Sequence, residues 1–151
     1  MLKILYSFII SMMILSMASA GNAYDDISAI KETAMNYMES WYQGDADRMK
    51  SSLHDKLAKR SLKESSDGNQ ELRLTSASDM VLYTEMGYGK RLWKEAFTID
   101  VIVLDHYQNI ATVKVIAPHY LEYLHLVKKD HKWLIVNALY EKKQPESNWL
   151  E

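Results

Sequence analysis

Two parts of the sequence carry residues suited to proton transfer. Asp100 alternates with Ile102 and Leu104 in a strand-like run, which places the three on one face. A carboxylate among such neighbours needs a partner or a shifted pKa, and could then act as a general acid or base. Alternatively, Asp100 lies solvated at the rim of a sheet, because Asp is rarely buried.

His54 and Asp55 are adjacent and form the second candidate. An imidazole beside a carboxylate can relay a proton near neutral pH. The alternative is a turn at the end of a helix, since neighbouring turn residues seldom both point into one pocket.

Aromatic residues at helical spacing could line a cavity that stacks on a planar ligand. In the alternative interpretation they are ordinary core residues. The predicted pocket residues are Tyr37, Trp41, Tyr83, Trp93 and Asn137.

Other site chemistries find no support in the sequence. The absence of Cys excludes thiol nucleophiles, disulfides and cysteine zinc sites. Among the five His, His119 and His125 would share a strand face but lie about 20 Å apart, too far for a common ion. There is no G-x-S-x-G elbow and no phosphate-binding glycine loop. We therefore predict neither a metal site nor a cofactor.

The charge balance also restricts the partners. Lys and Arg number 18 against 20 Asp and Glu, a net charge of −2, so we do not expect nucleic-acid binding. A local basic cluster is interpreted as a solvated face; it consists of Lys56, Lys59, Arg60 and Lys63.

The first half of the chain after residue 24 is predicted to be helical. Asp25 and Asp26 begin a helix of roughly 17 residues that ends at Gly44. Asp45 or Asp47 caps a second, shorter helix, and Ser76 opens a third through a capping box with Asp79. Between residues 54 and 74 the signal is weak: residues 57–63 fit a short strand or a helix end, and residues 64–70 a loop.

The second half alternates with a period of two. Four strands are predicted, at residues 97–105, 110–117, 120–128 and 132–140, and their short links imply antiparallel neighbours. A tight turn at Asp130-His131 would pair Lys128 with Trp133, Leu126 with Ile135 and Leu124 with Asn137. Because this hairpin is apolar on both faces, both faces are expected to be covered, and a homodimer through the sheet would cover one.

Together these elements predict an α+β fold, with N-terminal helices packed on a curved antiparallel sheet. One domain spans residues 25–143, and residues 144–151 form a polar tail. The first twenty residues have the layout of a secretory signal peptide: Lys3, an uncharged run of about 14 residues, and Ala18-Ser19-Ala20. Cleavage is expected after Ala20, or alternatively after Ala23, giving a secreted or periplasmic protein without stable membrane insertion. The alternative is an uncleaved anchor, although the run is short for a membrane span.

Three segments resemble the putative lumazine-binding family of the nuclear transport factor 2-like (SnoaL-like) superfamily. They are WYQGDADRM from Trp41 to Met49, LHDKLAKR from Leu53 to Arg60, and YLHLVKKDHKWLIVN from Tyr123 to Asn137. The resemblance implies a cone-shaped, cystatin-like fold with a pocket between sheet and helices, often dimeric through the sheet. It assigns no catalytic position, because the superfamily includes isomerases, cyclases and dehydratases as well as binding proteins.

The leading hypothesis is an exported, non-catalytic protein that binds a small planar or hydrophobic molecule or acts as an accessory protein. The alternatives are an isomerase, cyclase or dehydratase that uses Asp100 or His54, and a protein-interaction module.

Overall fold

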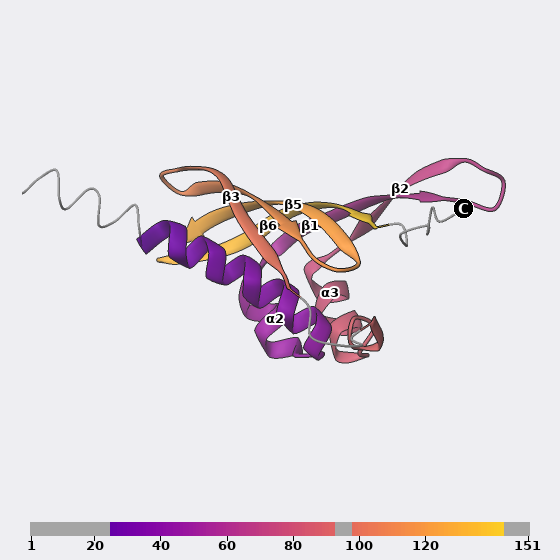
Figure 1. Cartoon of the computed structure of the whole chain (residues 1–151), viewed down its shortest axis with the longest axis horizontal. Coiled ribbons are helices and arrows are strands. Elements are labelled where there is room, and N and C mark those ends of the chain that lie inside the picture. Colours follow the sequence, from indigo (N-terminus) through magenta and orange to yellow (C-terminus); the bar gives the residue numbers. More distant parts are fainter. Residues whose placement is uncertain (1–24, 93–97, 144–151) are drawn as a thin grey trace, which may run out of the picture.

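The computed structural model describes residues 25–92 and 98–143, which form one sheet with helices packed on one of its faces (Figure 1). The predicted signal peptide, Trp93 and the predicted tail lie outside these residues. Residues 25–43 form the N-terminal helix. The elements that follow are α2 (Ala46–Ser52), β1 (Leu53–Glu64), β2 (Gln70–Thr75), α3 (Ala77–Glu85), the short 3-10 helix η1 (Lys90–Leu92), β3 (Asp100–Tyr107), β4 (Ile110–Ile116), β5 (Tyr120–Lys129) and β6 (Lys132–Lys142).

The N-terminal helix lies across the sheet and supplies much of the core. It buries Ile30, Ala34, Tyr37 and Met38 completely or almost so. The helix ends where Gly44 adopts a φ of +74°, a left-handed conformation that glycine tolerates best. The expected long helix with an aromatic buried face is confirmed.

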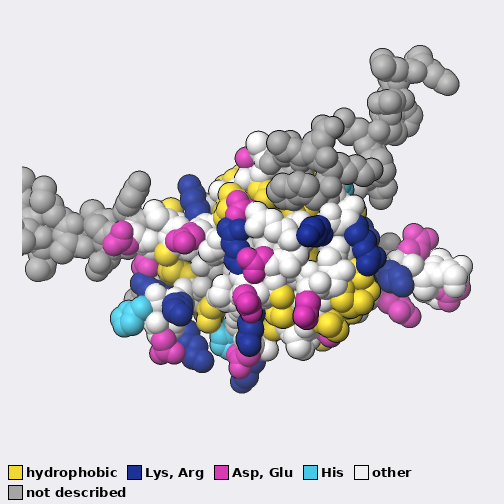
Figure 2. Space-filling view, turned by 90° about the horizontal axis from the view of Figure 1, so that it is seen from below, with side chains coloured by type: hydrophobic (Ala, Val, Ile, Leu, Met, Phe, Trp, Pro, Cys, Tyr) yellow, Lys and Arg dark blue, Asp and Glu magenta, His cyan; other side chains and the backbone are white. Residues whose placement is uncertain are grey.

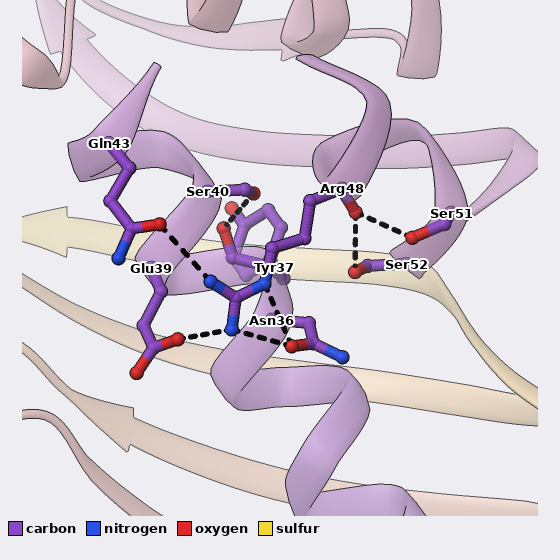
Figure 3. Close-up of polar contacts among 8 residues, drawn as sticks. All are labelled: Asn36, Tyr37, Glu39, Ser40, Gln43, Arg48, Ser51 and Ser52. Carbon is purple, nitrogen blue, oxygen red and sulfur yellow. Dashed lines mark hydrogen bonds and ion pairs between the residues drawn. The ribbon is translucent and has the colours of Figure 1, made fainter. Parts of the chain in front are cut away.

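Arg48 joins α2 to the N-terminal helix (Figure 3). Its Nε and Nη2 donate to Asn36 Oδ1 at 2.9 and 2.7 Å, and Nη2 also forms an ion pair with Glu39. Asp45 caps α2 by accepting a hydrogen bond from the Arg48 backbone N–H. The capping box of Ser76 and Asp79 that begins α3 is also present, as predicted.

The sheet has six strands in the order β2-β1-β6-β5-β4-β3. The four strands expected in the second half are β3 to β6, with small shifts at their ends, and their pairings are antiparallel. β1 pairs with β2 in a hairpin and lies parallel to β6. The sequence indicated this hairpin only weakly, because β1 is dense in charged residues and shows no clear alternation of apolar side chains.

A bulge changes the register of the β5–β6 hairpin. Lys128 pairs with Trp133 and Leu126 with Ile135, as predicted, but His125 then pairs with Asn137 and Leu124 with Ala138. The expected pairing of Leu124 with Asn137 is therefore wrong. One extra residue in β6 reverses the faces of the residues that follow it.

The two faces of the sheet differ in exposure. The face toward the helices buries residues such as Val113, Leu124 and Ile135 at 0% exposure. Large apolar side chains on the opposite, outer face are 42–62% exposed; they include Leu62, Leu72, Leu74, Ile102, Tyr123 and Leu139.

Near its start, the N-terminal helix is tied to the sheet by Asp26. One carboxylate oxygen of Asp26 accepts hydrogen bonds from Lys128 Nζ at 2.5 Å and from Trp133 Nε1 at 3.1 Å. His106 Nε2 lies 3.9 Å from the other oxygen. The hydrogen bond from Lys128, followed by that from Trp133, holds the pKa of Asp26 below its usual range against the opposing effect of burial.

Asp26→Asn should lower the free energy of unfolding at pH 7 by about 1–2 kcal/mol, because charge-assisted hydrogen bonds are lost. Since the folded-state pKa of Asp26 is depressed, its contribution is complete above the unfolded-state pKa of about 3.9 and disappears as pH falls through the folded-state value. Urea titrations from pH 7 to pH 2.5 should therefore show the two proteins converging in acid. Asp25→Asn, which removes the same charge from an exposed neighbour, is the control; an equal loss there would assign the effect to the helix dipole.

Candidate functional site

A cavity of about 270 Å³ lies between the helices and the inner face of the sheet. Figure 2 views the molecule from the helix side, where hydrophobic side chains reach the surface toward the β1–β2 hairpin. Each wall comes from a different part of the chain. The lining residues are Tyr37, Met38, Trp41, Lys59, Arg73, Thr75, Met80, Tyr83, Tyr88, Leu92, Tyr120, Glu122, Tyr140 and Lys142.

A closed triangle of polar groups is buried in the cavity wall. Lys59 Nζ donates to Glu122 Oε2 and to the Tyr37 hydroxyl, both at 2.6 Å, and Tyr37 in turn donates to Glu122 Oε2 at 3.0 Å. The side chains of Lys59 and Glu122 are only 7% and 3% exposed. Lys59 Nζ also lies 4.0 Å from the centre of the Tyr140 ring, close enough for a cation–π interaction. The ammonium group is therefore fully surrounded by favourable partners.

Burial dominates the electrostatics of this triangle. It lowers the pKa of Lys59, and the nearby Glu122 carboxylate opposes that shift. Burial, then the charge of Glu122, raises the pKa of Tyr37 well above its usual value. Burial, followed by the charges of Tyr140 and then Glu122, raises the pKa of Tyr120. The phenols thus stay protonated and can donate hydrogen bonds.

One polar atom of the buried triangle remains available to a ligand. All hydrogen bonds of the Glu122 side chain to described residues use Oε2, which leaves Oε1 as an acceptor. Trp41 Nε1, by contrast, is buried against Gly89, and the Trp41 side chain also interacts with Tyr120. An acceptor in the cavity wall is a group that can orient a bound molecule.

Aromatic rings form the remaining walls. Tyr83 and Tyr88 stack with ring centroids 5.4 Å apart and an interplanar angle of 16°, and Tyr120 meets Tyr140 edge to face at 5.9 Å. Gly89 presses against Trp41: a Cβ at Gly89 would lie 2.2 Å from the Trp41 carbonyl oxygen. Only glycine permits this approach, which confines the indole.

Three of the five predicted pocket residues line this cavity: Tyr37, Trp41 and Tyr83. Trp93 lies outside the described residues. Asn137 is on the outer face, where it accepts a hydrogen bond from Arg60 Nη1 at 2.7 Å and contacts His125. The bulge in β6 causes this, because it turns Asn137 away from the side on which the predicted register had placed it.

Neither proposed proton-transfer residue lines the cavity. Asp100 is exposed at the start of β3, an edge strand, on the same outward side as Ile102. His54 Nδ1 lies 2.8 Å from Asp55, whose side chain is 80% exposed, and accepts a hydrogen bond from the Lys56 backbone N–H. The His54–Asp55 contact is therefore real but belongs to the start of β1.

Lys59 and Glu122, the charged pair in the cavity, were not predicted. Lys59 was assigned to a solvated basic face; that was wrong, since it is 6% exposed. A signal did exist for Glu122, which alternates with Tyr120 and Leu124 on the buried side of the strand predicted at residues 120–128. A carboxylate in that position requires a cationic partner, and the lysines of the predicted basic cluster were candidates for that partner.

Comparison with known proteins places this architecture in a family. A family profile described as "Putative lumazine-binding" matches residues 25–141, most of the chain. The chain belongs to the putative lumazine-binding family. No match was found among curated proteins.

Solved structures support the fold of this lumazine-binding family member. A nuclear transport factor 2-like protein of unknown function from Silicibacter pomeroyi is 16% identical with a TM-score of 0.61, covering 80% of this chain and 98% of its own. One from Shewanella baltica is 13% identical with a TM-score of 0.61, covering 81% and 97%. A third, with a cystatin-like fold, from Novosphingobium aromaticivorans is 10% identical with a TM-score of 0.59, covering 87% and 90%. The expected α+β, cystatin-like fold is confirmed.

The described residues offer no alternative centre of metal chemistry, since they contain no group of three or more His, Asp or Glu able to hold an ion. No helix within 25–92 or 98–143 is long and apolar enough to cross a membrane.

Breaking the buried ion pair should be costly. Lys59→Met leaves the Glu122 charge uncompensated and should reduce the free energy of unfolding by about 3–5 kcal/mol in chemical denaturation. The double variant Lys59→Met/Glu122→Leu should lose less than Lys59→Met alone, because the orphaned charge is removed. Lys56→Met, on the exposed part of the same strand, is the control. Additive losses in the double variant would show that the two residues are not energetically coupled.

Proposed function

We propose that this protein binds a small planar molecule in the cavity and performs no chemistry on it. The observation that carries the proposal is the combination of aromatic walls with a triangle of Lys59, Glu122 and Tyr37 whose charges are already satisfied. Because the charges of the triangle satisfy each other, few polar atoms of the lining are left to bind a ligand. Those few atoms can fix the orientation of a ligand that the aromatic walls hold. The family name supports a bicyclic heterocycle such as lumazine, and 270 Å³ suits a ligand of about two rings.

Thermal shift against lumazine and other planar heterocycles tests the proposal. A ligand at 100 times its Kd stabilises the native state by about 2.7 kcal/mol and raises the melting temperature by several degrees. Thr75→Phe, at a buried position in the cavity wall, should abolish the shift. Leu74→Phe, the adjacent residue on the outer face, should retain it.

Tyr83→Leu, at a half-buried wall position, provides a second test if Thr75→Phe does not fold. It should weaken binding by removing one stacked ring. If no planar compound stabilises the wild-type protein, or if Thr75→Phe leaves the shift unchanged, binding in this cavity is refuted.

An enzymatic function is the second candidate, and one observation favours it. Glu122 Oε1 makes no hydrogen bond to the described residues, and Glu122 lines the cavity, which suits a base that removes a proton from bound substrate. This function replaces the one built on Asp100 or His54. Deuterium incorporation into a bound ligand, lost in Glu122→Gln, would distinguish it from binding alone. The remaining alternative, a protein-interaction module, predicts that side chains fill the space between helices and sheet, whereas a cavity of about 270 Å³ lies there.

Self-association through the outer face of the sheet is part of the proposal. A row of paired residues crosses all six strands there and is mostly apolar: Leu74, Arg60, Leu139, Tyr123, Lys114 and Ile102. Exposed apolar area of this extent is typical of an interface.

Light scattering after size exclusion should give a dimer mass, because pairing two copies through this face removes its exposed apolar side chains from water. Leu139→Glu should convert the dimer to a monomer by burying a charge in the interface. Leu82→Glu, at a similarly exposed position on α3, should leave it dimeric. A monomer for the wild type would contradict the proposal.

Export is also proposed, on the basis of the charged, apolar and small-residue segments of residues 1–20. Intact mass measurement of protein recovered outside the cytoplasm should show an N-terminus at Gly21, or at Tyr24 for the alternative cleavage. Recovery only from cytosol with Met1 present would contradict export.

A further inference from the structure

The cavity lining contains more basic than acidic side chains. Lys59 and Glu122 neutralise each other at 2.6 Å. Two further basic residues, Arg73 and Lys142, line the cavity and are exposed to solvent. The lining therefore carries a net positive charge.

Strand register places both cations at the open side of the cavity. Arg73 lies two residues from the buried Thr75 on β2 and pairs with Ser61. Lys142 lies two residues beyond Tyr140 on β6 and pairs with Tyr120. Residues two apart on a strand share a face, so the two cations extend the inner face beyond the buried wall.

Neither cation forms an ion pair with a described residue. No carboxylate of residues 25–92 or 98–143 lies within ion-pair distance of Arg73 or Lys142. The pKa of Asp79 is lowered mainly by its hydrogen bonds with Ser76 and to a small extent by the charge of Arg73, so Asp79 interacts with Arg73 from beyond ion-pair distance. In Figure 2, basic side chains border the hydrophobic area next to the β1–β2 hairpin. An unpaired Arg beside an apolar cavity is suited to bind a carboxylate through two parallel hydrogen bonds.

We infer that the ligand is a planar organic acid whose carboxylate lies between Arg73 and Lys142 and whose other end donates a hydrogen bond to Glu122 Oε1. This inference rests on the proposed binding function and specifies the ligand class. The orientation follows from hydrogen bonding: Glu122 Oε1 can only accept, so it pairs with a hydroxyl or N–H donor and not with a carboxylate oxygen. The aromatic rings between the two ends contact the flat body of the ligand.

Three bicyclic probes separate the two ends of the ligand. 6-Hydroxy-2-naphthoate carries both the donor and the carboxylate, 2-naphthol carries the donor alone, and 6-methoxy-2-naphthoate carries the carboxylate alone. Titration calorimetry at low and high salt should give 6-hydroxy-2-naphthoate an affinity at least tenfold higher than either of the others. Salt should weaken only the two carboxylates, because the cations at the mouth are exposed.

Variants test the residues. Arg73→Gln and Lys142→Gln should each weaken 6-hydroxy-2-naphthoate five- to tenfold and leave 2-naphthol unchanged. Lys132→Gln, an exposed lysine at the opposite end of β6 from Lys142 and outside the lining, is the matched control and should alter neither. These exposed substitutions avoid the buried pair and are expected to fold.

Each outcome bears on a different claim. If 2-naphthol binds as tightly as 6-hydroxy-2-naphthoate, or if Arg73→Gln and Lys142→Gln match Lys132→Gln, the organic-acid inference is overturned while binding in the cavity stands. If none of the three probes binds, the inference is also overturned. The proposed function itself then depends on the separate screen of planar heterocycles.

Discussion

Lys59 and Glu122 connect strands that are not neighbours. Lys59 is on β1 and Glu122 on β5, with β6 between them, and Tyr37 of the N-terminal helix joins both. Burying two charges costs several kcal/mol per ion, and only close pairing with further hydrogen bonds offsets that cost. The hydrogen bonds of the pair therefore oppose any shift of β1, β5 or the N-terminal helix that would lengthen them. The cavity lies beside these three elements.

The same constraint affects what the site can do. A satisfied ion pair offers little to a ligand, so specificity depends on the atoms that remain: Glu122 Oε1 and the cations at the mouth of the cavity. The aromatic rings supply affinity through buried area, and the polar atoms supply orientation. Family membership describes the architecture, but the fold hosts many functions, so the function has to be argued from these atoms.

Local sequence patterns predicted some helices and strands of the fold better than others. Caps at Asp45 and Ser76 and the period-two alternation of β4 to β6 are short-range signals, and they predicted those elements well. β1 carries so many charged residues that local hydrophobicity could not indicate a central strand. Its place inside the sheet depends on pairing with β6, a strand distant in the sequence whose register with β1 shifts between Leu53 and Ala58.

By itself the sequence determined the absence of thiol chemistry, the α+β succession of helices and strands, and the aromatic residues of the N-terminal helix, because composition and periodicity are local properties. Tertiary structure alone decided that Lys59 is buried, that Asn137 faces outward and that Asp100 lies at an exposed edge. The physical reason is the same for all three. The environment of a polar side chain depends on strand order and on single-residue bulges, and a shift of one residue moves it from one face of the sheet to the other.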